Sequence, residues 1–326
     1  MPEIVLHRFF AREVLHRLPK PVQDHIDPEV YALGSRGPDP LGIVYFYRLP
    51  RWKREHGKSN LLHTKGCGLL FRSLTEEAKS APEEIRQPLF SFLAGFLTHY
   101  ALDSTCHPYI IFQAGAGKEN AGNHRSLEHA LDRKRLKEQG MDLHARPITR
   151  ELLPKAGLPP GIRPAVDAAF RKAFGWEDAW KLLNRAYRDE RRFLRLTEDP
   201  VGSFYGLLRR VTANRNLRSL SYAEPSYPEA DIANGQHRAW RNPYAPEITS
   251  RRSMADLETE AANLAEAWIT GVHASLYEAG DFPEAIGNRS FESGLDADDS
   301  RNNGPITCSV LPGRESTKEA KTAWNN

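Results

Sequence analysis

The chain has few cysteines, no long apolar run and almost no net charge. Its 326 residues include only three cysteines, Cys67, Cys106 and Cys308. An odd number of cysteines without paired spacing argues against a disulfide-built scaffold and favours a reducing compartment. We expect Cys67 and Cys106 to be small core residues, not metal ligands.

Membrane spans and secretion signals are also missing from the pattern. No segment approaches the roughly 18 consecutive apolar residues that a transmembrane helix needs, and residues 1–8 lack the apolar core of a signal peptide. A net charge of +3 is close to neutral for this length and gives no strong pointer to nucleic acid or to an anionic membrane. We therefore expect a cytoplasmic protein without a transmembrane segment, and nucleic acid is not excluded as a partner.

Helical periodicity runs through almost the whole chain, and strand-like alternation never lasts more than a few residues. The pattern predicts an all-α protein with helices at about 4–18, 59–74, 85–104, 121–138, 163–174, 177–197, 202–220 and 253–279. We expect one helical domain over residues 1–290. A polar and disordered tail would follow over residues 291–326.

Candidate metal ligands gather in the most apolar part of the chain. From residue 89 to residue 117 the only formally charged side chain is Asp103. A carboxylate among apolar residues is costly unless something cationic meets it, and no Lys or Arg lies nearby in the sequence. A bound metal ion would offset this cost, and suitable ligands for such an ion lie close by in the sequence. They are the imidazoles of His99, His107 and His124 and the carboxylate of Glu128. The plainer interpretation is a buried His–Asp hydrogen-bonded pair.

Three further residues extend the set along the chain. His7 lies on the apolar stripe of the first helix, Asp39 in a proline-flanked loop, and His63 on a later apolar face. With the segments 34–40, 95–109 and 124–132, this order of ligand types resembles the zinc-dependent phospholipase C family. That family shares its fold with single-strand nucleases of the P1 type. The resemblance covers roughly residues 1–280.

The resemblance implies a single multi-helix domain of this type and a metal-dependent phosphoester hydrolase holding two to three Zn²⁺ ions. Its substrate would be a phosphoester such as a phospholipid headgroup. Carried onto this sequence, Asp103 would bridge two ions, one of which would also take Asp39, His63 and His99. His7 would hold the other bridged ion, and a separate third ion would take His107, His124 and Glu128. Asp39 would orient or deprotonate the attacking water.

The sequence departs from the family pattern at its start and in one spacing. Secreted members use their mature N-terminal residue as a ligand to the ion assigned here to His7, and the nitrogen of Pro2 or Met1 is the candidate substitute. The spacing from Asp103 to His107 is short. Asp132 lies two turns beyond His124, where it is a candidate proton acceptor for a ligating imidazole. We expect a structural role for His129.

Two other functions remain open. A single-strand nuclease or nucleotidase on the same scaffold would need aromatic platforms for bases, for which Tyr45, Phe46, Tyr47 and Trp52 are candidates. A non-catalytic helical interaction protein would use zinc only to hold its helices together. Structural zinc sites favour closed, cysteine-rich tetrads, whereas this set is His and carboxylate and has too many ligands for one ion. The sequence does not indicate an oligomeric state.

Overall fold

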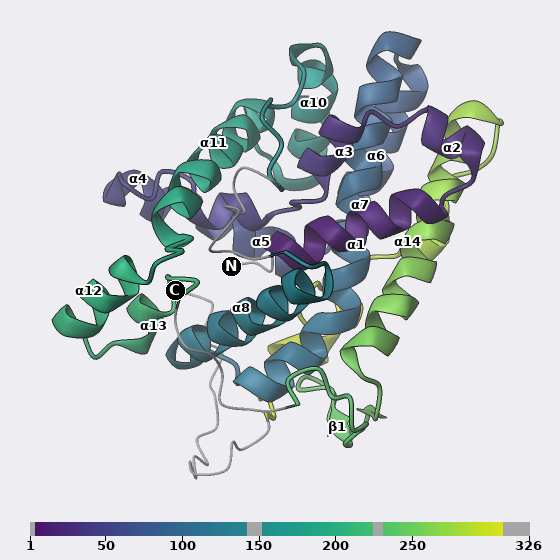
Figure 1. Cartoon of the computed structure of the whole chain (residues 1–326). Helices are drawn as coiled ribbons and strands as arrows, with labels where there is room; N and C mark the ends of the chain where they lie inside the picture. Colours follow the sequence, from purple (N-terminus) through teal and green to yellow (C-terminus); the bar gives the residue numbers. More distant parts are fainter. Residues whose placement is uncertain (1–3, 142–151, 224–230, 309–326) are drawn as a thin grey trace.

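Helices make up nearly all of the regular structure (Figure 1). The computed structural model describes residues 4–141, 152–223 and 231–308. Its longer helices are α1 (Ile4–Arg17), α6 (Gly68–Ser80), α7 (Glu83–Ala114), α8 (Ala121–Glu138), α10 (Arg163–Phe174), α11 (Ala179–Thr197), α12 (Ser203–Val211) and α14 (Met254–Tyr277). Shorter ones are α2 (Lys20–Asp24), α3 (Pro28–Gly34), α4 (Leu49–Glu55), α5 (Gly57–Thr64) and α13 (Arg215–Arg218). The all-α prediction is confirmed.

Short elements complete the description. Single 3₁₀ turns are η1 (Asp39–Ile43), η2 (Lys118–Asn120), η3 (Pro160–Ile162), η4 (Glu284–Ile286) and η5 (Ser300–Asn303). Within the described ranges the strands are β1 (Trp240–Arg241) and β2 (Thr249–Ser250), an antiparallel pair in which Trp240 faces Ser250. This small ribbon was not predicted, because two residues are too few to show an alternating pattern.

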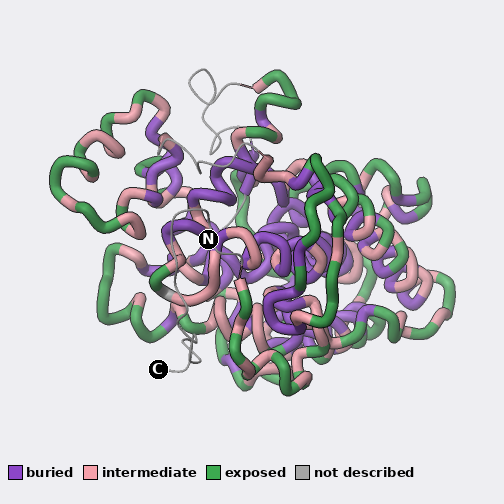
Figure 2. The backbone as a smooth tube through the Cα atoms, turned by 90° about the horizontal axis from the view of Figure 1, so that it is seen from below, coloured by how far each residue is buried: buried purple, intermediate pink, exposed green. Residues whose placement is uncertain are grey.

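Helix α7 forms the centre of the molecule. It contacts α1, α3, α6, α8 and α14, and every residue from Leu89 to Ser104 is buried. A helix that is apolar on all sides is stable only when neighbours cover it completely. Figure 2 shows these central segments as buried and the outer connections as exposed. His99 and Asp103 of α7 therefore lie inside the core.

Two glycines let α3 cross α7 at very short range. A Cβ atom on Gly34 would lie 2.1 Å from the carbonyl oxygen of Phe92, and one on Gly95 would lie 2.1 Å from that of Tyr31. Because no side chain fits at either position, the two backbones approach directly. This crossing fixes the path of the loop after α3, which carries Asp39.

Several predicted helix limits agree with the structure and several do not. Those at 121–138 and 163–174 agree. The helix predicted at 59–74 is wrong: it is two helices, α5 and α6, separated by a turn at Gly66 with φ of 36°. The N-cap of α5 is His56, so this helix begins before residue 59. The helix predicted at 202–220 is likewise two, α12 and α13.

The helix predicted at 85–104 was too short. Helix α7 continues to Ala114 and includes Pro88 and Pro108. A proline inside a helix lacks the backbone N–H and usually interrupts it, which is why the pattern indicated an earlier end. The longer helix places His99, Asp103 and His107 four residues apart on one face, so the short Asp103-to-His107 spacing is that of one helical turn.

Residues beyond 290 are part of the packed structure as far as they are described. Phe291 is fully buried, and its backbone N–H donates to the carbonyl oxygen of His63 over 2.9 Å. The rest of the predicted tail, 309–326, lies outside the described residues, and the division at residue 290 stays a prediction. Among the described helices, none is long and apolar enough to cross a membrane.

Candidate metal centre

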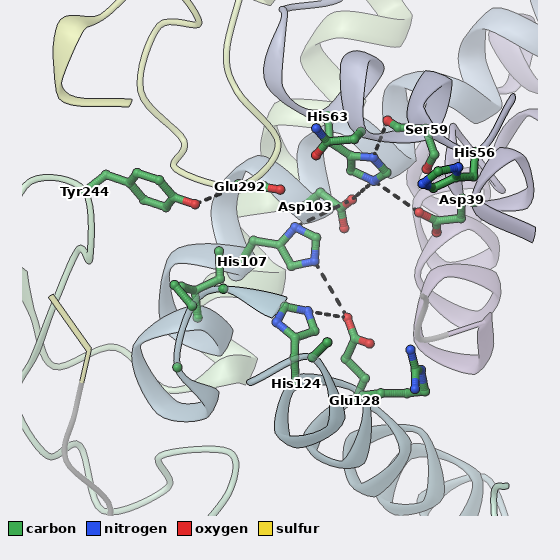
Figure 3. A pocket seen from close by; sticks show the side chains of 18 of the residues that line it. Asp39, His56, Ser59, His63, Asp103, His107, His124, Glu128, Tyr244 and Glu292 are labelled. Carbon is green, nitrogen blue, oxygen red and sulfur yellow. Dashed lines mark hydrogen bonds and ion pairs between the residues drawn. The ribbon is translucent and has the colours of Figure 1, made fainter. Parts of the chain in front are cut away.

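The candidate ligands surround one cavity of about 290 Å³ (Figure 3). Its walls come from α1, η1, α5, α7 and α8, together with side chains from two later segments, Tyr244 and Glu292. All eight residues singled out in the sequence lie in or directly beside this cavity. Helices far apart in sequence therefore converge on one polar pocket within an apolar core.

The first group consists of Asp39, His63, His99 and Asp103, each with a ligand atom within 4.8 Å of the others. The Nε2 atom of His99 lies 2.9 Å from Asp103 Oδ2 and 3.7 Å from Asp39 Oδ2. His63 Nε2 lies 3.1 Å from Asp39 Oδ1 and 3.7 Å from Asp103 Oδ2. Two carboxylates and two imidazoles thus face a common point.

His7 approaches the same group from α1. Its Nε2 lies 3.2 Å from Asp103 Oδ1, the oxygen that does not face His99. Its ring stacks on the ring of His99 with centroids 4.0 Å apart. Asp103 therefore presents one oxygen to His7 and the other to His99 and His63, as a carboxylate that bridges two ions would.

The second group consists of His107, His124 and Glu128. Glu128 Oε1 lies 2.8 Å from Nε2 of His124 and 3.9 Å from Nε2 of His107. Because His124 and Glu128 are one turn apart on α8 and His107 is on α7, the packing of these two helices assembles the group. Asp103 Oδ2 lies 3.8 Å from His107 and so links the two groups.

Backbone carbonyls orient three of the imidazoles. The Nδ1 atoms lie 2.8 Å from Ser59 O for His63, 3.3 Å from Ser35 O for His99 and 3.1 Å from Phe291 O for His107. An Nδ1–H that donates to a carbonyl leaves the Nε2 lone pair as the free acceptor. In all three rings Nε2 points at a carboxylate of the site, and this is the usual support of a metal-ligating histidine.

A glycine allows the loop before η1 to pass close to His99. Gly37 has a φ of 51°, and a Cβ there would lie 2.4 Å from the His99 ring. Only glycine satisfies both the backbone angle and the contact. The loop carries Asp39 to within reach of His63 and His99.

The protonation states favour a cation in the pocket. Burial, reinforced by the neighbouring His99, lowers the pKa of His7 to about 4, so this ring is neutral at neutral pH. Burial alone would raise the pKa of Asp103, but the imidazoles of His107, His99 and His7 outweigh it and hold the pKa well below its usual range. The pKa of Glu128 is lowered in the same way, with His124 outweighing burial. The carboxylates of Asp103 and Glu128 are therefore charged, and the His7 ring beside Asp103 is neutral.

Several buried polar atoms of the site lack the hydrogen bonds that such atoms normally make. Among the described residues no hydrogen bond reaches His99 Nε2, Asp103 Oδ2 or Asp39 Oδ2. His99 Nε2 and Asp103 Oδ2 are 2.9 Å apart, but they are not aligned for a hydrogen bond. Leaving buried polar atoms unpaired costs about 1–3 kcal/mol each, so this arrangement fits an ion that accepts all three lone pairs. The donor set, imidazole with carboxylate, suits Zn²⁺.

A buried arginine, Arg36, lies close to the carboxylate of Asp39. Arg36 is 1% exposed and makes paired hydrogen bonds to Glu190 of α11, the shortest 2.7 Å. Its Nη2 also lies 4.0 Å from Asp39 Oδ2. This ion pair joins the loop after α3 to α11. Sequence reasoning missed this ion pair, because its partners are 154 residues apart.

Asp132 does not accept a proton from a ligating imidazole, contrary to the sequence-based expectation. Its oxygens accept the backbone N–H groups of Val5 (3.3 Å) and Leu6 (3.0 Å) and the hydroxyl of Tyr222 (3.0 Å). These N–H groups belong to the first turn of α1, whose amides have no partner within the helix. Asp132 therefore anchors the end of α1 that carries His7. His129 packs beside it, its ring stacked on that of Tyr222.

Replacing Asp132 by Ala should lower the free energy of unfolding by about 3 kcal/mol, because buried donors lose their acceptor. Denaturant titration of the purified protein measures this. The control Tyr222→Phe removes a single donor and should cost about 1 kcal/mol. If Asp132→Ala were no more destabilising than the control, Asp132 would not anchor α1.

Other cavity-lining residues were missed in the sequence. His56 lines the cavity together with Asn60, Tyr244 and Glu292, and none of the four was singled out from the sequence. Tyr244 donates a hydrogen bond to Glu292 over 2.8 Å. In contrast, the aromatic residues proposed as base platforms (Tyr45, Phe46, Tyr47 and Trp52) are not among the lining residues. Pro2 and Met1 lie outside the described residues.

Comparison with known proteins identifies a family. A family model described as zinc dependent phospholipase C matches residues 6–172, just over half of the chain. The match includes all eight candidate ligands and ends before α11. No curated protein and no solved structure gives a significant match.

Proposed function

The chain belongs to the zinc-dependent phospholipase C family, and from this premise we propose that it hydrolyses phosphodiesters at the cavity bounded by Asp39, His63, Asp103 and Glu128. The observation that carries the proposal is the bridging geometry of Asp103, with His7 3.2 Å from one oxygen and His99 2.9 Å from the other. A purely structural zinc site is closed by its ligands. Here the two groups open into a cavity that a small substrate could enter.

We propose that Asp39, His63, His99 and Asp103 hold one zinc ion, that His7 with Asp103 holds a second, and that His107, His124 and Glu128 hold a third. When bound, zinc supplies a Lewis acid for the phosphoryl oxygens and lowers the pKa of a nearby water. Asp39, the carboxylate of this group that does not bridge, would orient the attacking water and accept its proton. The carbonyls of Ser59, Ser35 and Phe291 keep the imidazoles in the ligating tautomer.

The size and lining of the cavity favour a phospholipid headgroup as the substrate. A volume of about 290 Å³ accommodates a phosphodiester and a small alcohol, but it is at the lower end for drug-sized ligands and too small for two acyl chains. The wall on one side is apolar or small, with Ile111, Gly115 and Ala116. The residues considered as base platforms for a single-strand nuclease, Tyr45, Phe46, Tyr47 and Trp52, do not line this cavity.

A direct test compares three substrates with the zinc-loaded protein: phosphatidylcholine vesicles, a chromogenic phosphodiester and a single-stranded oligonucleotide. We expect cleavage of the first two, loss of that cleavage after chelation and recovery after zinc is returned. Cleavage of the oligonucleotide alone would replace the phospholipid with nucleic acid. If a fully zinc-loaded protein cleaved none of the three, hydrolase activity would be refuted in favour of a structural zinc site.

A further inference from the structure

One side of the molecule exposes apolar side chains on a helix that has no buried residue. Helix α12 has none within its nine residues, and in Figure 1 it projects with α13 at the left edge of the molecule. Soluble helices are normally held by an apolar face packed on the core. The large hydrophobic side chains exposed here are Leu196, Val201, Leu207, Val211 and Leu217, at 60%, 81%, 56%, 68% and 46% exposure.

Polar contacts hold the first turn of α12 in place. The carboxylate of Asp199 accepts the backbone N–H groups of Phe204 (3.0 Å) and Tyr205 (2.7 Å) and the hydroxyl of Ser221 (2.7 Å). It thus joins the first turn of α12 to the segment after α13. The exposed leucines and valines on the outer side are available for a partner.

The charge of this side has one sign. Between residues 179 and 223 the acidic residues are Asp189, Glu190, Glu198 and Asp199, and all four are buried. The arginines of the same segment include exposed ones on both α11 and α12, at 188, 192, 195, 209 and 210. Arg209 and Arg210 make no ion pair or hydrogen bond with any described residue. The face therefore combines exposed aliphatic groups with uncompensated positive charge.

This face is connected directly to the wall of the metal cavity. The side-chain oxygen of Asn216 on α13 accepts a hydrogen bond from the backbone N–H of Gly122 over 2.6 Å. The backbone carbonyl of Asn216 accepts a second one from Nη1 of Arg125 over 2.8 Å. Both partners are at the start of α8, where Arg125 lines the cavity and His124 belongs to the second ligand group. A partner bound to α12 and α13 would lie beside the cavity.

We propose that α12, α13 and the end of α11 form a docking surface for an anionic lipid bilayer, with Leu207 and Val211 entering the headgroup boundary and Arg209 and Arg210 contacting lipid phosphates. Amphipathic surface helices that combine aliphatic and arginine side chains bind such bilayers by burying apolar area and by electrostatic attraction to anionic lipids. Nucleic acid fits less well, since the exposed side chains are aliphatic and offer bases no aromatic face. The inference goes beyond phosphodiester hydrolysis, because the surface would act whether or not the lipid is cleaved.

Vesicle sedimentation with the full-length zinc-loaded protein tests the proposal. We expect the protein to bind vesicles containing phosphatidylserine or phosphatidylglycerol, and to bind pure phosphatidylcholine much more weakly. The double variant Arg209→Ala, Arg210→Ala should weaken partitioning by roughly 25-fold, since each basic residue near an anionic membrane contributes about a factor of five. Leu207→Ser with Val211→Ser should weaken it by at least about tenfold.

Matched controls change the same residue types elsewhere. Arg251→Ala with Arg252→Ala, next to β2, and Ile248→Ser, which is 43% exposed, should leave vesicle binding unchanged. All variants should unfold like the wild type, because none of the substituted side chains is buried. Repeating the assay in Asp103→Asn, which should lack hydrolase activity, separates failure of docking from failure of the proposed function.

Three outcomes would overturn the proposal. The first is an absence of binding to anionic vesicles. The second is binding that the α12 variants and the control variants reduce equally. The third is tight binding of single-stranded nucleic acid, or self-association, that the α12 variants abolish while vesicle binding is unchanged.

Discussion

Asp103→Asn should abolish phosphodiester hydrolysis, with kcat/KM falling at least about a thousandfold, because the Lewis acid chemistry it would support is worth several kcal/mol. The reason is geometric: Oδ1 and Oδ2 of Asp103 face His7 and His99 separately. An amide offers one oxygen and one NH₂ group, so it can serve only one of these sides. Zinc content should fall together with activity.

The matched control is Asp24→Asn. This carboxylate is on the surface, where it pairs with Lys20, and its loss should change neither zinc content nor activity. Circular dichroism should show unchanged helix content in both variants, since Asn has nearly the shape of Asp. Wild-type activity in Asp103→Asn would remove the bridging role from Asp103.

Removing zinc should strongly destabilise the folded protein. An ion present at about a thousand times its Kd stabilises the fold by about 4 kcal/mol for each site. For the two separate ligand groups this is about 8 kcal/mol, which corresponds to a fall in Tm of roughly 12 °C for a protein of this size. Thermal unfolding with and without a chelator measures the shift.

A variant of the second ligand group, His107, His124 and Glu128, separates the contributions of the two groups to zinc-dependent stability. His124→Ala should remove about half of the zinc-dependent increase in Tm and leave the rest, since the first group lies on other residues. His16→Ala is the control, because this histidine is on the exposed side of α1. Equal Tm values for zinc-loaded and chelated wild type would mean that the buried carboxylates and imidazoles form a stable polar network without an ion.

The fold class and the convergence of the candidate residues on one cavity could be predicted because their signals are local. His99 and Asp103, like His124 and Glu128, are one helical turn apart within apolar surroundings, and such spacing survives errors in helix limits. The order of ligand types along the chain added the distant His7, Asp39 and His63. Their roles as zinc ligands stay a prediction that the arrangement in the cavity supports.

The features that were missed depend on contacts between distant segments. The buried Arg36–Glu190 pair, the carbonyl of Phe291 behind His107 and the contact of Asp132 with α1 leave no periodic trace in the sequence. Helix α7 extends through Pro108 because surrounding helices cover it, and tertiary packing here outweighs the local preference of proline. The net charge of +3 likewise conceals the basic face of α11 and α12, since acidic residues elsewhere balance it.

The most direct test of the central claim is the zinc content per chain, measured by elemental analysis of protein purified without added metal or chelator. The arrangement of Asp39, His63, His99 and Asp103 beside His107, His124 and Glu128 predicts two or three zinc equivalents. A single equivalent would contradict a multinuclear centre. A protein that held no zinc even after zinc was offered would contradict the hydrolase proposal as a whole.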